Sequence, residues 1–129
     1  MNGILLDTHA LLWWICGDPR IQALGQHIEA SPKPVFVSVI SLWELQIKSQ
    51  LGKLELSSPL SDLLADLAQC GLAGPIPFRQ EHVLELERIP LIHKDPFDRA
   101  LVSQARAEGL VLASHDESIL RYPLETWKI

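Results

Sequence analysis

Short apolar runs alternate along the chain with longer stretches in which apolar residues recur at helical spacing. The short runs are typical of buried strands in length and composition, and they lie at 3–6, 35–38 and 110–113. The longer stretches predict helices at 8–16, over about ten residues ending at 30, and at 41–51, 60–70, 81–88 and 95–108, with a helical turn at 116–120. The proline-bounded segment 74–78 suits only an edge strand, and 124–127 is the last candidate strand. Strands that alternate with helices predict an α/β fold with a parallel sheet covered on both faces, in a single domain that spans residues 1–129.

The composition supports a packed core and argues against a strongly basic protein. Hydrophobic residues make up 47% of the 129 positions and charged residues 21%, which is not the composition of a disordered chain. The formal net charge is −5 at pH 7, so the chain lacks the basic surface with which non-specific nucleic-acid binders displace counterions. If the substrate is an anion, something other than the net charge must attract it.

Several features predict a cytoplasmic protein without a membrane segment. The most apolar internal run, 35–45, contains Glu44 and is far shorter than the roughly 20 residues of a membrane helix. Asp7 interrupts the apolar N-terminal run, which no lysine or arginine precedes, so no signal peptide is expected. Cys16 and Cys70 lie far apart in apolar stretches, which favours buried free thiols in a reducing compartment over a disulfide.

The motifs of several enzyme classes are missing from the sequence. There is no GxSxG, P-loop or GxGxxG segment, and no cysteine–histidine spacing typical of zinc sites. His27 and His82 lie on predicted helices and are expected at the surface or partly packed. The other histidines each lie within two residues of an aspartate, which makes them candidates for phosphate contacts or for support of a metal site: His9, His93 and His115. The four tryptophans are expected in the core or in interfaces rather than as platforms for base stacking.

Acidic residues gather where the predicted strands end. Asp7 directly follows the first strand, Asp116 comes three residues after the strand 110–113, and Glu44 lies on the helix that follows the second strand. Asp95 and Asp98 open the helix just upstream of the strand 110–113. Because ligands of an open parallel sheet bind outside the carboxyl ends of its strands, these carboxylates are the candidate functional residues.

Each of these acids also has a purely structural interpretation. Asp7, Asp95 and Asp116 are suitable N-caps, and Asp98 in the first turn of a helix favours the helix dipole. Glu44 is equally compatible with an ordinary solvent-exposed helix position. The residues alone therefore leave the structural and functional interpretations both open.

A divalent cation would account for the acids if they converge. Neighbouring carboxylates raise one another's pKa unless a cation compensates their charge. Ligand sets made only of oxygen favour Mg²⁺ or Mn²⁺, and such an ion would supply the positive charge that this chain lacks for holding a phosphodiester.

Four segments carry the polar residues in a defined order. They are LLDTHALLW at 5–13, SVISLWEL at 38–45 with GKL at 52–54, HKDPFDR at 93–99, and SHD at 114–116. Together they resemble the PIN-domain proteins, and most closely the VapC-like toxin branch of type II toxin–antitoxin systems. The resemblance covers nearly the whole chain.

The resemblance implies a three-layer α/β/α sandwich around a mainly parallel sheet of four or five short strands, and a metal-dependent endoribonuclease. Mg²⁺ is the implied cofactor, with Mn²⁺ as a substitute, and Asp7 is the expected central ligand. The implied catalytic and metal-binding acids are Asp7, Glu44, Asp98 and Asp116, with Asp95 as an additional metal ligand that belongs to the DPFD variant. Contacts around the ligands or the substrate are expected from Thr8, Ser41, Arg99 and Ser114, the last of which stands where threonine is frequent. The implied partners are an RNA substrate, a cognate antitoxin that covers the active site, and a second copy in a homodimer, with a larger toxin–antitoxin assembly left open.

Three other functions fit the same size and sheet. A response-regulator receiver should carry an aspartate after its third strand, where this chain has Arg79 and Gln80. A haloacid-dehalogenase-like phosphatase should carry a second aspartate two residues after the first, where this chain has His9. A non-catalytic interaction module should lack some of the acids, and none of the four is missing here.

Overall fold

The structure is a computed structural model that describes residues 2–129. Its sheet has five strands, all parallel, in the order β3-β2-β1-β4-β5. The strands are β1 (Ile4–Leu6), β2 (Val35–Ser38), β3 (Ala73–Ile76), β4 (Val111–Ser114) and β5 (Thr126–Lys128). The α-helices are α1 (Thr8–Cys16), α2 (Gln22–Ala30), α3 (Val39–Gln50), α4 (Leu60–Asp66), α5 (Gln80–Glu85), α6 (Pro96–Glu108) and α7 (Glu117–Leu120), with 3₁₀ turns at Pro19–Ile21 and Leu86–Arg88.

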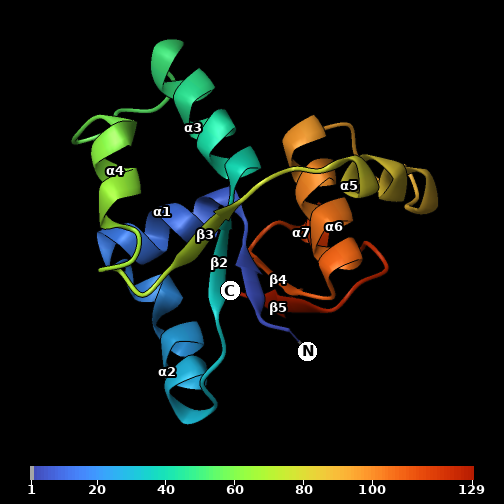
Figure 1. Cartoon of the computed structure of the whole chain (residues 1–129), viewed down its shortest axis with the longest axis horizontal. Coiled ribbons are helices and arrows are strands. Elements are labelled where there is room, and N and C mark those ends of the chain that lie inside the picture. The colour runs from blue at the N-terminus through green and yellow to red at the C-terminus, as the bar shows by residue number, and fades with distance from the viewer. Residues whose placement is uncertain (1) are drawn as a thin grey trace.

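The helices form a layer on each side of the sheet, as the alternation of elements predicted. Figure 1 shows α1, α2 and α4 on one side, α5, α6 and α7 on the other, and α3 extending from the end of β2. Side chains of a strand point alternately to opposite faces. Ile4 and Leu6 accordingly join one apolar cluster, and Leu5 joins the other. The predicted α/β/α sandwich with a parallel sheet is confirmed.

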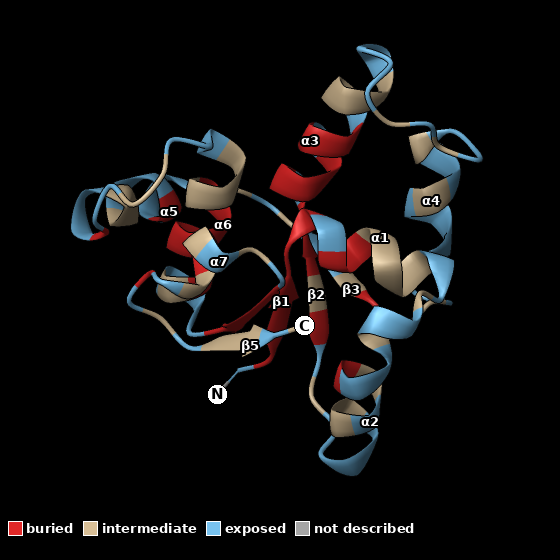
Figure 2. Cartoon of the chain, turned by 180° about the vertical axis from the view of Figure 1, so that it is seen from behind, coloured by how far each residue is buried: buried red, intermediate tan, exposed pale blue. Residues whose placement is uncertain are grey.

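Burial follows this layering. The strand β1 and the inner parts of α1, α3 and α6 are buried, whereas most of α4 is exposed (Figure 2). Within residues 2–129 no helix is both long enough and apolar enough to cross a membrane.

Several element boundaries differ from the sequence prediction. Helix α3 begins at Val39 rather than at 41, because the Ser38 hydroxyl accepts a hydrogen bond from the Ile40 backbone N–H (3.0 Å) and caps the helix directly after the strand. The predicted helix 81–88 divides into α5 and a 3₁₀ turn.

Two predictions of burial were wrong. Cys16 is exposed and Cys70 half-buried, although both are free thiols as predicted. His82, expected at the surface or partly packed, is only 1% exposed, and its ring bonds to the side chain of Glu108 at the end of α6.

The strand order determines where a ligand site can form. Strands β2 and β3 lie on one side of β1, and β4 and β5 lie on the other. The chain segments that leave the carboxyl ends of β1 and β4 therefore run toward opposite edges of the sheet and diverge there. This point is where open α/β sheets bind their ligands.

Candidate functional site

Asp7 lies at the divergence point, between the end of β1 and the start of α1. One carboxylate oxygen, Oδ1, accepts the Ala10 backbone N–H (2.8 Å) and caps α1. The other, Oδ2, accepts a hydrogen bond of 2.5 Å from the Ser114 hydroxyl at the end of β4. The side chain is buried, and burial raises the pKa of Asp7 above its ordinary value, although the bonds from Ser114 and Ala10 oppose the shift. Asp7 therefore caps α1, as the structural interpretation predicted, and this bond leaves its role as a metal ligand a prediction.

Glu44 is buried rather than solvated, being only 3% exposed. The Thr8 hydroxyl donates to its Oε1 atom (2.7 Å) and lies 3.1 Å from the Ser41 hydroxyl. The Lys48 ammonium donates to Oε2 (2.6 Å), and this bond raises the pKa of Lys48. The interpretation of Glu44 as an ordinary surface residue is thus wrong. Helices α1 and α3 fix its carboxylate in one orientation.

Asp98 approaches the same end of the sheet from the first turn of α6. Its Oδ2 atom lies 3.2 Å from the His93 Nε2 atom. Burial, and then the negative charge of Asp95, raise the pKa of Asp98 to about 7, with further contributions from Glu44 and Asp116. Asp98 is therefore a carboxyl group that resists ionisation in the absence of a compensating cation.

Asp95 and Asp116 both cap helices, as the structural interpretation predicted. Asp95 is exposed, and its Oδ1 atom accepts the backbone N–H groups of Phe97 (2.9 Å) and Asp98 (3.1 Å). Asp116 accepts the Ser118 N–H (2.7 Å) at the start of α7. Ligand atoms of Asp116, Asp98 and His93 nevertheless all lie within 4.8 Å of one another.

The five acids form one electrostatic cluster. Asp116 raises the pKa of both Asp7 and Asp98, and the latter is also raised by Asp95 and Glu44. The sequence prediction that these carboxylates converge at one end of the sheet is therefore consistent with the structure. What the sequence prediction missed is the ion pair between Lys48 and Glu44, for which their i, i+4 spacing was the available signal.

The other candidate residues lie around this cluster in different ways. The Ser114 hydroxyl bridges Asp7 and the Asp116 backbone N–H (3.0 Å), while the Arg99 guanidinium donates to the Pro90 carbonyl and the Tyr122 hydroxyl rather than to an acid of the cluster. His9 and His115 both pack against the ring of Trp13, with centroid distances of 6.1 and 5.6 Å.

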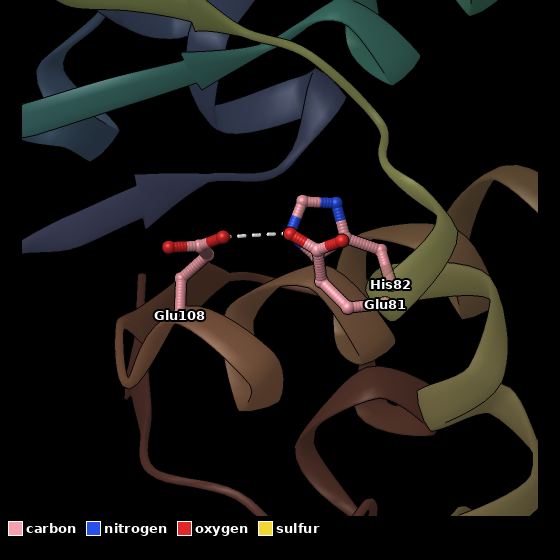
Figure 3. A group of neighbouring side chains, drawn as sticks. All are labelled: Glu81, His82 and Glu108. Carbon is pink, nitrogen blue, oxygen red and sulfur yellow. Dashed lines mark hydrogen bonds and ion pairs between the residues drawn. The ribbon is translucent and has the colours of Figure 1, made fainter.

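A second group of acids and histidine lies at the C-terminal end of α6, opposite the end that carries Asp98 (Figure 3). Its members are Glu81, His82 and Glu108. The His82 Nδ1 atom accepts the Arg79 backbone N–H (2.9 Å), so Nε2 carries the ring proton and donates it to the Glu108 carboxylate (2.7 Å). With both ring nitrogens engaged, His82 has no lone pair for a metal. The group joins α5 to α6 and is a structural contact.

Replacement of Thr8 by valine is expected to lower the free energy of unfolding by about 1–3 kcal/mol. Valine has the same shape but cannot donate to the Glu44 Oε1 atom, which would remain buried without this partner. Urea denaturation measures the change, and Thr8→Ser, which keeps the hydroxyl, is the control. Equal losses in the two variants would show that the hydroxyl contributes nothing.

Comparison with known proteins confirms the family. The PIN domain matches residues 4–124, so the chain belongs to the PIN-domain family. No curated protein sequence matches the chain. This membership supports a nuclease and removes the receiver and phosphatase alternatives, and the strand order here also differs from the 2-1-3-4-5 order of receivers.

Solved structures with the same fold cover the chain almost completely. VapBC2 from Rickettsia felis, bound to a DNA fragment from their promoter, is 20% identical with a TM-score of 0.73, covering 97% of both chains. FitAcB from Neisseria gonorrhoeae is 20% identical (TM-score 0.67, 97% of this chain and 96% of that chain). DNA-bound VapBC from Salmonella typhimurium is 16% identical (TM-score 0.71, 99% and 98%). At these identities the likeness establishes the fold.

Proposed function

We propose that this PIN-domain protein is a metal-dependent endoribonuclease and the toxin of a type II toxin–antitoxin pair. The observation that carries the proposal is the acidic cluster at the ends of β1 and β4, in which burial raises the pKa of Asp7 and the pKa of Asp98. Such a cluster is costly without a cation and suited to one. The resemblance of its four motifs to VapC-like toxins supports RNA as the substrate.

The donor set fits Mg²⁺ or Mn²⁺. We assign the ion to Asp7, Asp98 and Asp116, with Asp95 as a peripheral acid, since all offer oxygen ligands. Each Glu44 oxygen accepts one hydrogen bond and keeps a second lone pair, so Glu44 contacts the ion directly or through water. When bound, the ion supplies activation of a water molecule and stabilisation of the leaving oxygen of the phosphodiester.

The chain's own residues contribute orientation and charge. Ser114 holds one oxygen of Asp7, and Thr8 and Lys48 hold the two oxygens of Glu44, so neither carboxylate has to reorganise during the reaction. The hydroxyl of Ser41, one turn before Glu44 on α3, lies beside the Thr8 hydroxyl and helps to hold it in place. A direct contact between Arg99 and the substrate stays a prediction.

We further propose a cognate antitoxin, a homodimer and a cytoplasmic location. The support for the antitoxin is that the VapBC and FitAcB structures share this fold over nearly the whole chain. A groove of about 380 Å³ beside α1, lined partly by Leu12, Ile15 and Leu63, offers apolar surface for such a partner. Trp43 on α3, which the sequence predicts to lie in the core or in an interface, is 58% exposed and therefore also available for contact with a partner.

The experiment for the function is cleavage of a panel of structured RNAs by the purified chain, free of antitoxin, with Mn²⁺ or Mg²⁺. Cleavage that EDTA abolishes supports the proposal. No cleavage by a folded protein that binds Mn²⁺, even after the panel is extended to total cellular RNA, would contradict the enzyme assignment and favour a binding module.

Replacement of Lys48 by methionine should lower the free energy of unfolding more in EDTA than in Mn²⁺. Without an ion, the variant leaves the buried Glu44 carboxylate without its ammonium partner, at a cost on the order of 1 kcal/mol because Lys48 is partly exposed. A bound cation would offset this loss. Urea denaturation under both conditions measures it, with Lys48→Arg as the control that keeps the charge, and equal losses in EDTA and Mn²⁺ would contradict the expectation.

A further inference from the structure

A chain of hydrogen bonds behind the acidic cluster ends on Asp98. Tyr122 follows α7 and is 3% exposed, and its hydroxyl lies 3.0 Å from the His93 Nδ1 atom. The other ring nitrogen of His93, Nε2, lies 3.2 Å from the Asp98 Oδ2 atom. Arg99 reaches the same hydroxyl with its Nη1 atom (3.2 Å) and is anchored on the Pro90 carbonyl (3.0 Å).

The donors around Tyr122 determine where each proton lies. Its hydroxyl has two lone pairs and one proton. The Arg99 guanidinium and the His93 backbone N–H (3.3 Å) can only donate, so they take both lone pairs. The hydroxyl proton must then go to an acceptor, and the His93 Nδ1 atom at 3.0 Å is nearer than the His93 carbonyl at 3.5 Å. With Nδ1 accepting, the imidazole proton is on Nε2, which donates to Asp98.

We propose that Tyr122 and His93 are positioning residues that orient the Asp98 carboxylate for its cation, and that His93 is not itself a metal ligand. The inference rests on the proposed function of the cluster. The ring donates to Oδ2 of Asp98 and so fixes the orientation in which this carboxylate would meet the ion. Arg99 begins the hydrogen-bond chain and fixes the direction of the Tyr122 proton.

The proximity of His93 to Asp98 and Asp116 would otherwise suggest a nitrogen ligand. Ligation by Nε2 requires a lone pair at that atom, and therefore a proton on Nδ1. A proton on Nδ1 would face a hydroxyl whose lone pairs are already taken by Arg99 and the His93 N–H. The polar contacts of Tyr122 thus disfavour ligation.

The protonated ring nitrogen can be measured directly. Long-range ¹H–¹⁵N correlation spectra of the labelled chain at about pH 8, where an ordinary imidazole is neutral, distinguish the two tautomers. We expect the His93 ring to carry its proton on Nε2, with and without Mg²⁺. Tyr122→Phe removes the donor to Nδ1 but keeps the Asp98 acceptor, so it should lower the share of the Nε2-protonated form without abolishing it. A proton on Nδ1 in the unaltered chain, or loss of the Nε2 proton when Mg²⁺ is added, would overturn the proposal.

Metal affinity tests the positioning role without measuring cleavage. By calorimetry, His93→Ala should weaken Mn²⁺ binding by about 10–100-fold, the usual effect of losing a residue that orients a ligand. His93→Gln keeps an N–H donor near the Nε2 position and should restore most of the affinity. His27→Gln, whose ring stacks on Trp127 away from the cluster, is the matched control. Unchanged affinity in His93→Ala would contradict the proposal.

Different results would contradict the positioning role of His93 and the proposed metal-dependent function. If the unaltered chain binds no Mn²⁺ at all, the metal-dependent function fails, while the tautomer spectra still decide how Tyr122 and His93 are bonded. If Mn²⁺ binds and RNA is cleaved but His93→Ala binds the ion as tightly as the unaltered chain, only the positioning role fails.

Discussion

Asp7→Asn is expected to reduce RNA cleavage at least about a hundredfold while leaving the fold intact. The Asp7 carboxylate lies where β1 and β4 end, and the negative charge of Asp116 already acts on it. An amide has one oxygen in place of two and no charge, so the site would lose its central ligand. The rate of cleavage of a fixed RNA in Mn²⁺, under single-turnover conditions, measures the loss.

The local structure of Asp7 explains why the fold should survive this change. Asparagine is as good an N-cap as aspartate, so the bond from the Ala10 N–H is kept. The amide nitrogen can donate to the Ser114 hydroxyl, and the cost of burying a charge disappears. The melting temperature in EDTA should therefore stay equal or rise, but its increase on addition of Mn²⁺ should vanish. Asp66→Asn, at an exposed position of α4, is the matched control, and full cleavage by Asp7→Asn would exclude Asp7 as a ligand.

The fold was predictable because the strands β1, β2 and β4 are short, mostly buried apolar runs, and stretches with helical periodicity separate them. The start of α3 was not, because Val39 and Ile40 continue the apolar run of β2 and only the capping bond of Ser38 separates strand from helix. The burial of His82 was not predictable from its neighbours in the sequence, because it depends on a contact with Glu108, 26 residues away.

The acids of the site were predictable because the topology of a parallel sheet brings strand ends together. Asp7 and Asp116 follow neighbouring strands, and their positions need no knowledge of side-chain packing. The groups that hold the acids were harder to find. Tyr122 reaches His93 across 29 residues and carries no motif of its own, so only the three-dimensional structure shows that it belongs to the site.

Asp98→Asn is expected to raise the stability of the metal-free protein at pH 8 while removing its response to Mn²⁺. Burial and the charge of Asp95 raise the pKa of Asp98 to about 7 in the folded chain, against an ordinary value of about 3.9 in the unfolded chain. Between about pH 4 and 7 the folded state therefore binds more protons than the unfolded state. Stability should fall as pH rises through this window, by up to about 1.4 kcal/mol per pH unit for this group, and the full penalty is present above pH 7.

In Asp98→Asn the amide does not ionise, so the dependence of stability on pH that Asp98 causes should disappear. In EDTA, its free energy of unfolding should exceed that of the unaltered chain at pH 8, and the difference should shrink toward pH 4, as measured by urea denaturation across that range. Asp62→Asn removes an exposed acid from the first turn of α4 and controls for the helix-dipole contribution, which favours an acid at that position. Lower stability of Asp98→Asn than of the unaltered chain at pH 8 would show that the Asp98 charge is compensated within the folded chain. Greater stability together with loss of the Mn²⁺ response would mean that the chain keeps a destabilising carboxylate because the cation requires it.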